Sequence, residues 1–188
     1  MKEKVSGFAS KRIAILGILT ALSLLTFILE NLLPPLFLPG AKLGLSNIFT
    51  LVTLLMFTPY DALILIAVRT TLGCLIVGNI SAILYSLSAG LVSVIVTIIL
   101  VQFAHPKISL LSISIVSATV HNITQVLMFC LLTSSSLMMS YIPYFALIGI
   151  FSGAVVGVIV YLLIHKVPLF YFERNLKIDI KSEKEQSC

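Results

Sequence analysis

Six long apolar segments, separated by short turn-forming sequences, limit this chain to a fold that crosses a membrane. A helix needs about 20 mostly apolar residues to span a bilayer, and every segment except the second is close to that length or above it. Strict alternation of apolar and polar residues is absent from the sequence, which disfavours an outer-membrane barrel. We therefore predict an all-α integral membrane protein with transmembrane helices at residues 11–33, 43–57, 60–77, 80–103, 108–133 and 141–165.

Charged residues are too few for a soluble protein. Only 10% of the 188 residues are Asp, Glu, Lys or Arg, against about 25% in a typical soluble domain. The 59% hydrophobic content also excludes a disordered chain. We divide the chain into a basic cytoplasmic N-terminus at residues 1–10, a six-helix transmembrane domain at 11–165, and a cytoplasmic juxtamembrane tail at 166–188.

The distribution of basic residues predicts the orientation. Six helices put both termini on one side, and that side would hold Lys2, Lys4, Lys11, Arg12, Lys107, Lys166, Arg174, Lys177, Lys181 and Lys184. The loops on the opposite side contain Lys42. Because basic residues concentrate on the cytoplasmic side, we predict a bacterial inner-membrane protein with both termini in the cytoplasm. The first apolar run is too long for most signal peptides and lacks a cleavage site, so we interpret it as a retained helix.

Polar side chains within or beside the apolar segments are the candidates for ligand binding, because ionisable groups in a membrane are costly and usually face a cavity or a partner. Counting about 1.5 Å per helical residue places most of them in the outer half of the membrane, with Arg69 near the midplane. The candidate substrate-binding residues are Glu30, Lys42, Asn47, Arg69, Asn79, Tyr85, His121, Asn122 and Gln125.

Structural roles remain open for several of these residues. Glu30 and Lys42 are equally consistent with an interfacial position, and Asn79 with capping a helix. Tyr141 and Tyr144 are better explained as aromatic anchors at the membrane surface.

The fifth and third segments carry the strongest polar signals. His121 and Gln125 share a helical face, and with Asn122 they would be expensive to bury without a polar partner. Arg69 keeps its charge, so it requires a carboxylate, carbonyls, water or an anionic ligand. A structural ion pair with Glu30 or Asp61 is the alternative to ligand binding.

Small residues recur at helical spacing in two segments. Gly149, Gly153 and Gly157 lie four residues apart in the sixth segment. Such stripes allow close approach of helices, and internal packing is their usual role. The stripe in the first segment could also dock a separate membrane subunit, and its candidate partner-binding residues are Ala14, Gly17 and Ala21.

Motifs for common enzyme chemistry are absent from the sequence. There is no Walker A loop, HExxH, GxSxG or Asp-rich diphosphate-binding motif. Cys74, Cys130 and Cys188 form no metal-ligand or disulfide pattern. We therefore predict a protein that is not an enzyme and requires no cofactor and no metal.

A series of short motifs resembles one membrane protein family. The motifs are KRIAILGILTA at 11–21, GAKLGLSN at 40–47, RTTLG at 69–73, GN at 78–79, YSLSAG at 85–90 and HNITQ at 121–125. Their order resembles the family described as Gx transporter or heptaprenyl diphosphate synthase component I, over roughly residues 10–165. This family in turn resembles the substrate-binding S components of energy-coupling factor (ECF) transporters.

The resemblance implies an S-component-like six-helix bundle that captures a small vitamin-like or anionic organic nutrient from outside. S components associate with a membrane T component and two ATPases, and the small residues Gly17 and Ala21 occupy the region of that contact. The implied pocket positions are Lys42, Asn47, Asn79, Tyr85, His121 and Gln125. The first alternative is a membrane component of polyprenyl diphosphate or quinone metabolism, in which Arg69 and Lys42 would hold an anionic head group. The second is an autonomous channel or facilitator.

Overall fold

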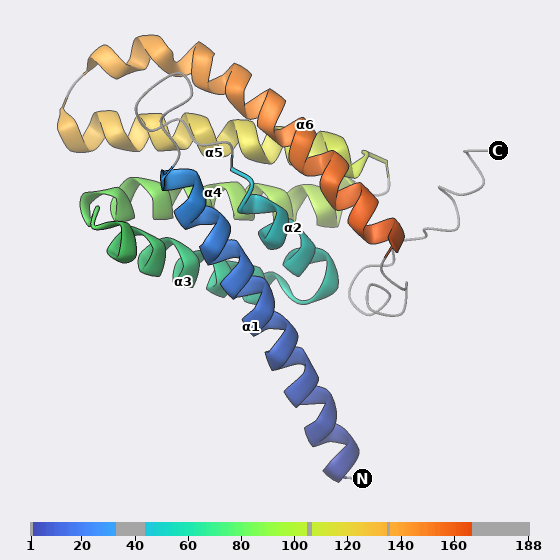
Figure 1. Ribbon diagram of the computed structural model, residues 1–188. Coiled ribbons are helices and arrows are strands. Elements are labelled where there is room, and N and C mark those ends of the chain that lie inside the picture. Colours follow the sequence, from blue (N-terminus) through green and yellow to red (C-terminus); the bar gives the residue numbers. More distant parts are fainter. Residues whose placement is uncertain (1, 33–43, 105–106, 135, 167–188) are drawn as a thin grey trace.

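The computed structural model describes residues 2–32, 44–104, 107–134 and 136–166, and these residues form helices joined by short turns (Figure 1). The helices are α1 (Lys2–Leu32), α2 (Asn47–Met56), α3 (Pro59–Val77), α4 (Ser81–Ala104), α5 (Leu110–Thr133), the 3-10 helix η1 (Ser136–Tyr141) and α6 (Ile142–Lys166). No strand occurs in the described ranges, where five helices are long and apolar enough to cross a membrane and α2 is a shorter apolar helix. The predicted all-α fold class with six principal helices is confirmed.

Two helices differ in extent from the prediction. α1 begins at Lys2, and its first turns project beyond the other helices (Figure 1). α2 begins at Asn47 because a turn precedes it, with Gly44 in the left-handed region at φ 68°. Its 10 residues span about 15 Å, roughly half the thickness of the hydrocarbon core. The short helix η1 was not predicted.

The start of α3 is fixed by a polar cluster that also holds α1. The backbone N–H of Thr58 donates to Asp61 Oδ2 over 3.0 Å, which caps the helix at Pro59. The guanidinium of Arg12 on α1 forms an ion pair with the same carboxylate and lies 5.9 Å from the centroid of the Phe57 ring. Asp61 therefore pairs with Arg12, and an Arg69–Asp61 ion pair, one of the alternatives for Arg69, does not occur among the described residues.

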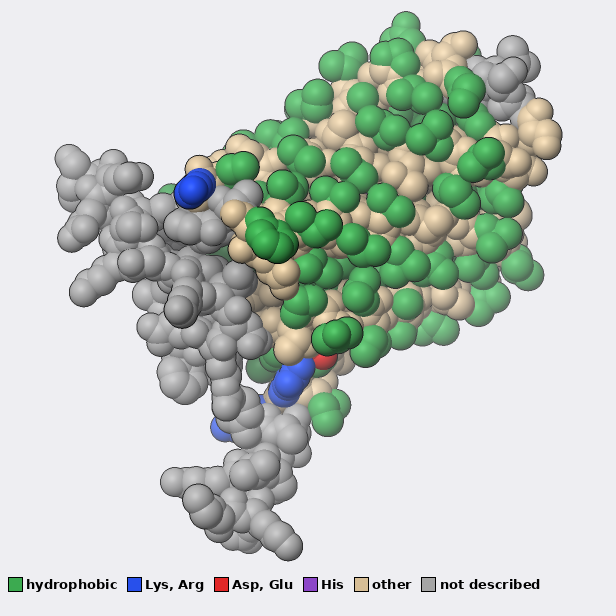
Figure 2. All heavy atoms as spheres, turned by 180° about the vertical axis from the view of Figure 1, so that it is seen from behind, with side chains coloured by type: hydrophobic (Ala, Val, Ile, Leu, Met, Phe, Trp, Pro, Cys, Tyr) green, Lys and Arg blue, Asp and Glu red, His purple; other side chains and the backbone are tan. Residues whose placement is uncertain are grey.

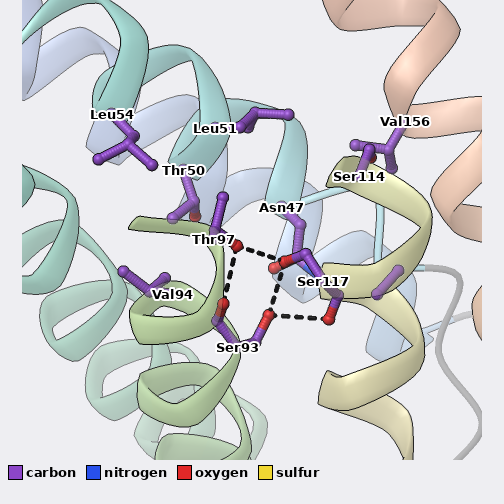
Figure 3. Close-up of a pocket in the computed structure, with 11 residues that line it drawn as sticks. Asn47, Thr50, Leu51, Leu54, Ser93, Val94, Thr97, Ser114, Ser117 and Val156 are labelled. Atoms are coloured by element: carbon purple, nitrogen blue, oxygen red, sulfur yellow. Dashed lines mark hydrogen bonds between the residues drawn. The ribbon is translucent and has the colours of Figure 1, made fainter. Parts of the chain in front are cut away.

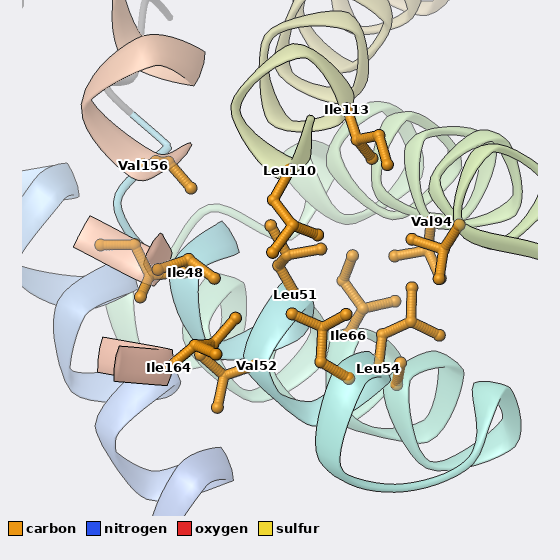
Figure 4. Packing of buried hydrophobic residues seen from close by; sticks show 14 residues of the cluster. Ile48, Leu51, Val52, Leu54, Ile66, Val94, Leu110, Ile113, Val156 and Ile164 are labelled. Carbon is orange, nitrogen blue, oxygen red and sulfur yellow. The ribbon is translucent and has the colours of Figure 1, made fainter. Parts of the chain in front are cut away.

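The main hydrophobic core surrounds α2, which contributes Ile48, Leu51, Val52, Leu54 and Leu55 (Figure 4). Side chains from the long helices α3, α4, α5 and α6 complete this cluster. The outer surface is also apolar, because many large hydrophobic side chains of the long helices are exposed, and the charged side chains seen in Figure 2 lie at the margin of its hydrophobic face. An apolar exterior is what a lipid environment favours.

The glycines of α6 allow it to pack directly on the backbone of α5, along which it runs in Figure 1. A Cβ atom added at Gly153 would lie 2.6 Å from Ile115 Cα, and one at Gly149 would lie 2.7 Å from Thr119 Cα. The stripe on α6 therefore serves internal packing. A Cβ atom at Gly17 on α1 would meet no atom within 4 Å.

Candidate functional site

A small pocket of about 20 Å³ lies where the C-terminal end of α1 meets the N-terminal end of α2 and the inner faces of α3, α4 and α5. The described residues that line it are Phe27, Glu30, Gly44, Ser46, Asn47, Arg69, Thr70, Ser86, His121 and Gln125. Five of the nine predicted substrate-binding residues are thus brought together from four helices, namely Glu30, Asn47, Arg69, His121 and Gln125.

Arg69 is the most deeply buried charged residue of the pocket, with 2% of its surface exposed. Its Nη2 donates to Asn47 Oδ1 over 2.8 Å, and its Nη1 donates to Ser23 Oγ over 3.3 Å. Ser23 Oγ in turn donates to the carbonyl of Ser46 over 3.2 Å. The Nε atom of Arg69 has no hydrogen-bond partner among the described residues.

A negative charge faces the same pocket. The Glu30 carboxylate accepts a hydrogen bond from the backbone N–H of Leu45, which ties the end of α1 to the turn before α2. Glu30 also interacts electrostatically with Arg69. Two opposite charges in one poorly hydrated pocket are screened weakly, so they attract each other more strongly than they would in water.

Hydroxyl groups complete the lining, and sequence reasoning did not single them out. Ser86 Oγ is buried without a hydrogen-bond partner in the described part of the chain, and Ser46 and Thr70 are also buried. Ser and Thr are common inside apolar helices because they can bond to the carbonyl four residues earlier. Their presence alone therefore carries little signal, although Ser46, Thr70 and Ser86 all lie in the short motifs on which the family resemblance rests.

Three other predicted residues lie outside this lining. Asn79 Oδ1 accepts the backbone N–H of Ala82 over 3.1 Å, which is the helix-capping role. The Tyr85 ring packs edge-on against the Phe129 ring at 5.7 Å between centroids. Asn122 Nδ2 donates to the carbonyl of Phe145 over 3.2 Å and so joins α5 to α6. Lys42 lies outside the described residues.

The predicted partner-binding residues share one exposed face of α1. Ala14, Gly17 and Ala21 are all exposed, and on the same helix Ser23 and Phe27 are buried against the bundle. This arrangement leaves the small-residue stripe open to the surroundings of the molecule.

The fold and the pocket together define a multi-pass helical membrane protein with a buried, charged polar site inside the bundle. The family profile described as heptaprenyl diphosphate synthase component I matches residues 19–163, well over half of the chain. The chain therefore belongs to this family, and the resemblance predicted from its motifs is confirmed. No curated protein and no solved structure gives a significant match.

Proposed function

We propose that this protein is a substrate-binding membrane subunit similar to the S components of ECF transporters. It captures a small vitamin-like or anionic organic nutrient from outside the cell. A T component and two ATPases drive its release into the cytoplasm, and the chain itself catalyses no reaction.

The observation that carries this proposal is a set of unused hydrogen-bonding groups around one pocket. Arg69 Nε and Ser86 Oγ both lack partners among the described residues, and both residues line the pocket. Leaving a buried donor unpaired costs about 1–3 kcal/mol, and more for a charged group. A carboxylate or carbonyl oxygen of a bound molecule would satisfy the Arg69 donor, so the pocket suits a ligand with such an acceptor.

The present pocket is too small for an organic nutrient. Its volume of about 20 Å³ is close to what one water molecule requires. Binding therefore requires the lining side chains to separate. Asn47 is well placed for this change, because a ligand oxygen could replace Asn47 Oδ1 at the Arg69 guanidinium.

A membrane component of polyprenyl diphosphate or quinone metabolism is the second candidate. Its support is the family description, together with a buried arginine that could bind an anionic head group. The Glu30 carboxylate in the same pocket disfavours a ligand with several negative charges.

Native mass spectrometry of gently purified protein tests the two candidates directly. The transport proposal expects a small polar molecule to co-purify. A prenyl diphosphate in its place, or turnover of a prenyl diphosphate by the purified chain, would favour the second candidate.

We predict that both chain termini lie in the cytoplasm. A reporter that is active only in the cytoplasm, fused after Cys188, should be active, because ten of the twelve Lys and Arg residues lie on that predicted side. A matched fusion to a reporter that works only outside the cytoplasm serves as the control. Activity of that second fusion would show that the topology is opposite to the predicted one, with the pocket on the wrong side of the membrane for uptake.

We predict that bulky side chains on the exposed stripe of α1 block transport without unfolding the protein. Gly17→Leu with Ala21→Leu should abolish close helix approach by a T component, and the melting temperature should stay within about 2 °C of the wild type because a Cβ atom at Gly17 meets nothing. Cellular uptake of the co-purified molecule is the readout. Leu147→Phe, at an exposed site on α6, is the control. Normal uptake by the double variant would exclude this docking face.

A further inference from the structure

A second cavity of about 20 Å³ lies between α2, α4, α5 and α6 (Figure 3). Its lining combines apolar side chains with the hydroxyl groups of Thr50, Ser93, Thr97, Ser114 and Ser117. Asn47 lines this cavity and the candidate binding pocket alike, so the two spaces are neighbours.

Three of the hydroxyl groups form a closed cluster (Figure 3). Thr97 Oγ1 donates to the carbonyl of Ser93 over 2.7 Å, and Ser93 Oγ donates to the carbonyl of Ser117 over 3.0 Å. Ser117 Oγ lies 2.6 Å from Thr97 Oγ1 and 2.9 Å from Ser93 Oγ. Each proton of the cluster is used, but a hydroxyl oxygen has two lone pairs, so the cluster can still accept a hydrogen bond.

Thr50 is the unsatisfied member of the lining. Thr50 is buried, and its Oγ1 has no hydrogen-bond partner among the described residues. Thr53, on the same helix, instead donates to the carbonyl of Phe49 over 2.7 Å. The corresponding carbonyl for Thr50, that of Ser46, accepts a hydrogen bond from Ser23.

We propose that this cavity binds an ordered water molecule, which accepts a hydrogen bond from Thr50 Oγ1 and donates to the Ser93–Thr97–Ser117 cluster. A cavity of this volume holds about one water, provided that two to four polar partners are available. None of the described lining residues is charged, which favours a neutral molecule over an ion. The water lies beside the candidate pocket, because Asn47 lines both spaces.

The experiment compares two threonines of α2. With the water bound, Thr50→Val removes one of its partners, and the melting temperature of the purified full-length protein should fall by about 2–4 °C. In a dry cavity the same change removes an unsatisfied hydroxyl, so the melting temperature would stay unchanged or rise. Thr53→Val is the matched control, because that hydroxyl is satisfied within its own helix. Thr50→Ser, which keeps the hydroxyl, should show a smaller fall than Thr50→Val.

A second measurement tests for the bound water even if the Thr50→Val variant does not fold. A wild-type crystal structure at about 2 Å resolution should show density for water at hydrogen-bond distance from Thr50 Oγ1. Crystals pressurised with xenon, which enters dry apolar cavities, should show none in this cavity. Xenon bound there, or an empty cavity at that resolution, would overturn the proposal.

Discussion

Replacing Arg69 with Gln is expected to weaken binding of the co-purified molecule by about tenfold to a hundredfold. This range corresponds to the loss of one charge-assisted hydrogen bond, about 1.5–3 kcal/mol. Arg69 is the expected anchor because its Nε is unpartnered among the described residues while Nη1 and Nη2 are held by Ser23 and Asn47. Because Ser23 holds Nη1, the guanidinium stays oriented when a ligand oxygen replaces Asn47 Oδ1 at Nη2, which reduces the entropic cost of binding. Retention of the molecule in native mass spectra and titration with the identified compound measure the effect.

A second pocket variant and a matched arginine test the specificity of that result. Gln125→Ala should also weaken binding, by a smaller factor, because a neutral hydrogen bond contributes less than a charge-assisted one. Arg12→Gln makes the same substitution at an arginine that pairs with Asp61 outside the pocket, and it should leave affinity unchanged. If Arg69→Gln lowers the melting temperature while affinity is preserved, Arg69 is a structural residue. Normal binding by both pocket variants would exclude the pocket.

Replacing Gly153 with Ala is expected to destabilise the protein by about 1–3 kcal/mol, although alanine is ordinarily the better helix former by about 1 kcal/mol. Here the substitution is expected to lower stability instead of raising it, because the new Cβ atom would lie 2.6 Å from Ile115 Cα and 2.8 Å from the Ser114 carbonyl oxygen. Backbone atoms cannot turn aside as a flexible side chain does, so α5 and α6 would have to separate. Gly153→Leu is expected to prevent purification of a monodisperse protein. Thermal unfolding in detergent and gel filtration provide the measurements.

Gly17→Ala is the control for this effect, because it makes the same change where no atom lies within 4 Å of the added Cβ. This variant should be as stable as the wild type, or slightly more stable. Equal melting temperatures for the two alanine variants would contradict the close packing of α6 on α5.

The class of the protein and the approximate extent of its helices follow directly from the sequence. Long apolar runs leave few alternatives, since backbone groups in lipid must be satisfied within each segment. Local signals were reliable where the chemistry is local. Helix α3 begins at Pro59, after the Thr58–Asp61 cap, at a turn-forming sequence between two apolar segments. It ends at the C-cap residue Gly78, which lies in the left-handed region at φ 76°. The ordered motifs also predicted the family correctly.

Which polar residues share a site depends on how the helices pack against one another. Depth along each helix can be counted from the sequence, but the rotation of each helix depends on how its neighbours pack. Consequently the pocket gathers Glu30, Asn47 and Arg69 with Ser86, whereas Asn79 and Asn122 bond to nearby backbone groups instead.

The two small-residue stripes also show that the partner of a helix face depends on how the helices pack. Both stripes place small residues at helical spacing, yet the glycines of α6 contact the backbone of α5 and Gly17 faces away from the bundle. Spacing shows that a helix can approach a neighbour closely, but which neighbour fills that face is a property of the assembled bundle. The unpaired hydroxyl of Thr50 likewise follows from packing, because nothing in the local sequence distinguishes it from Thr53, which is satisfied within its own helix.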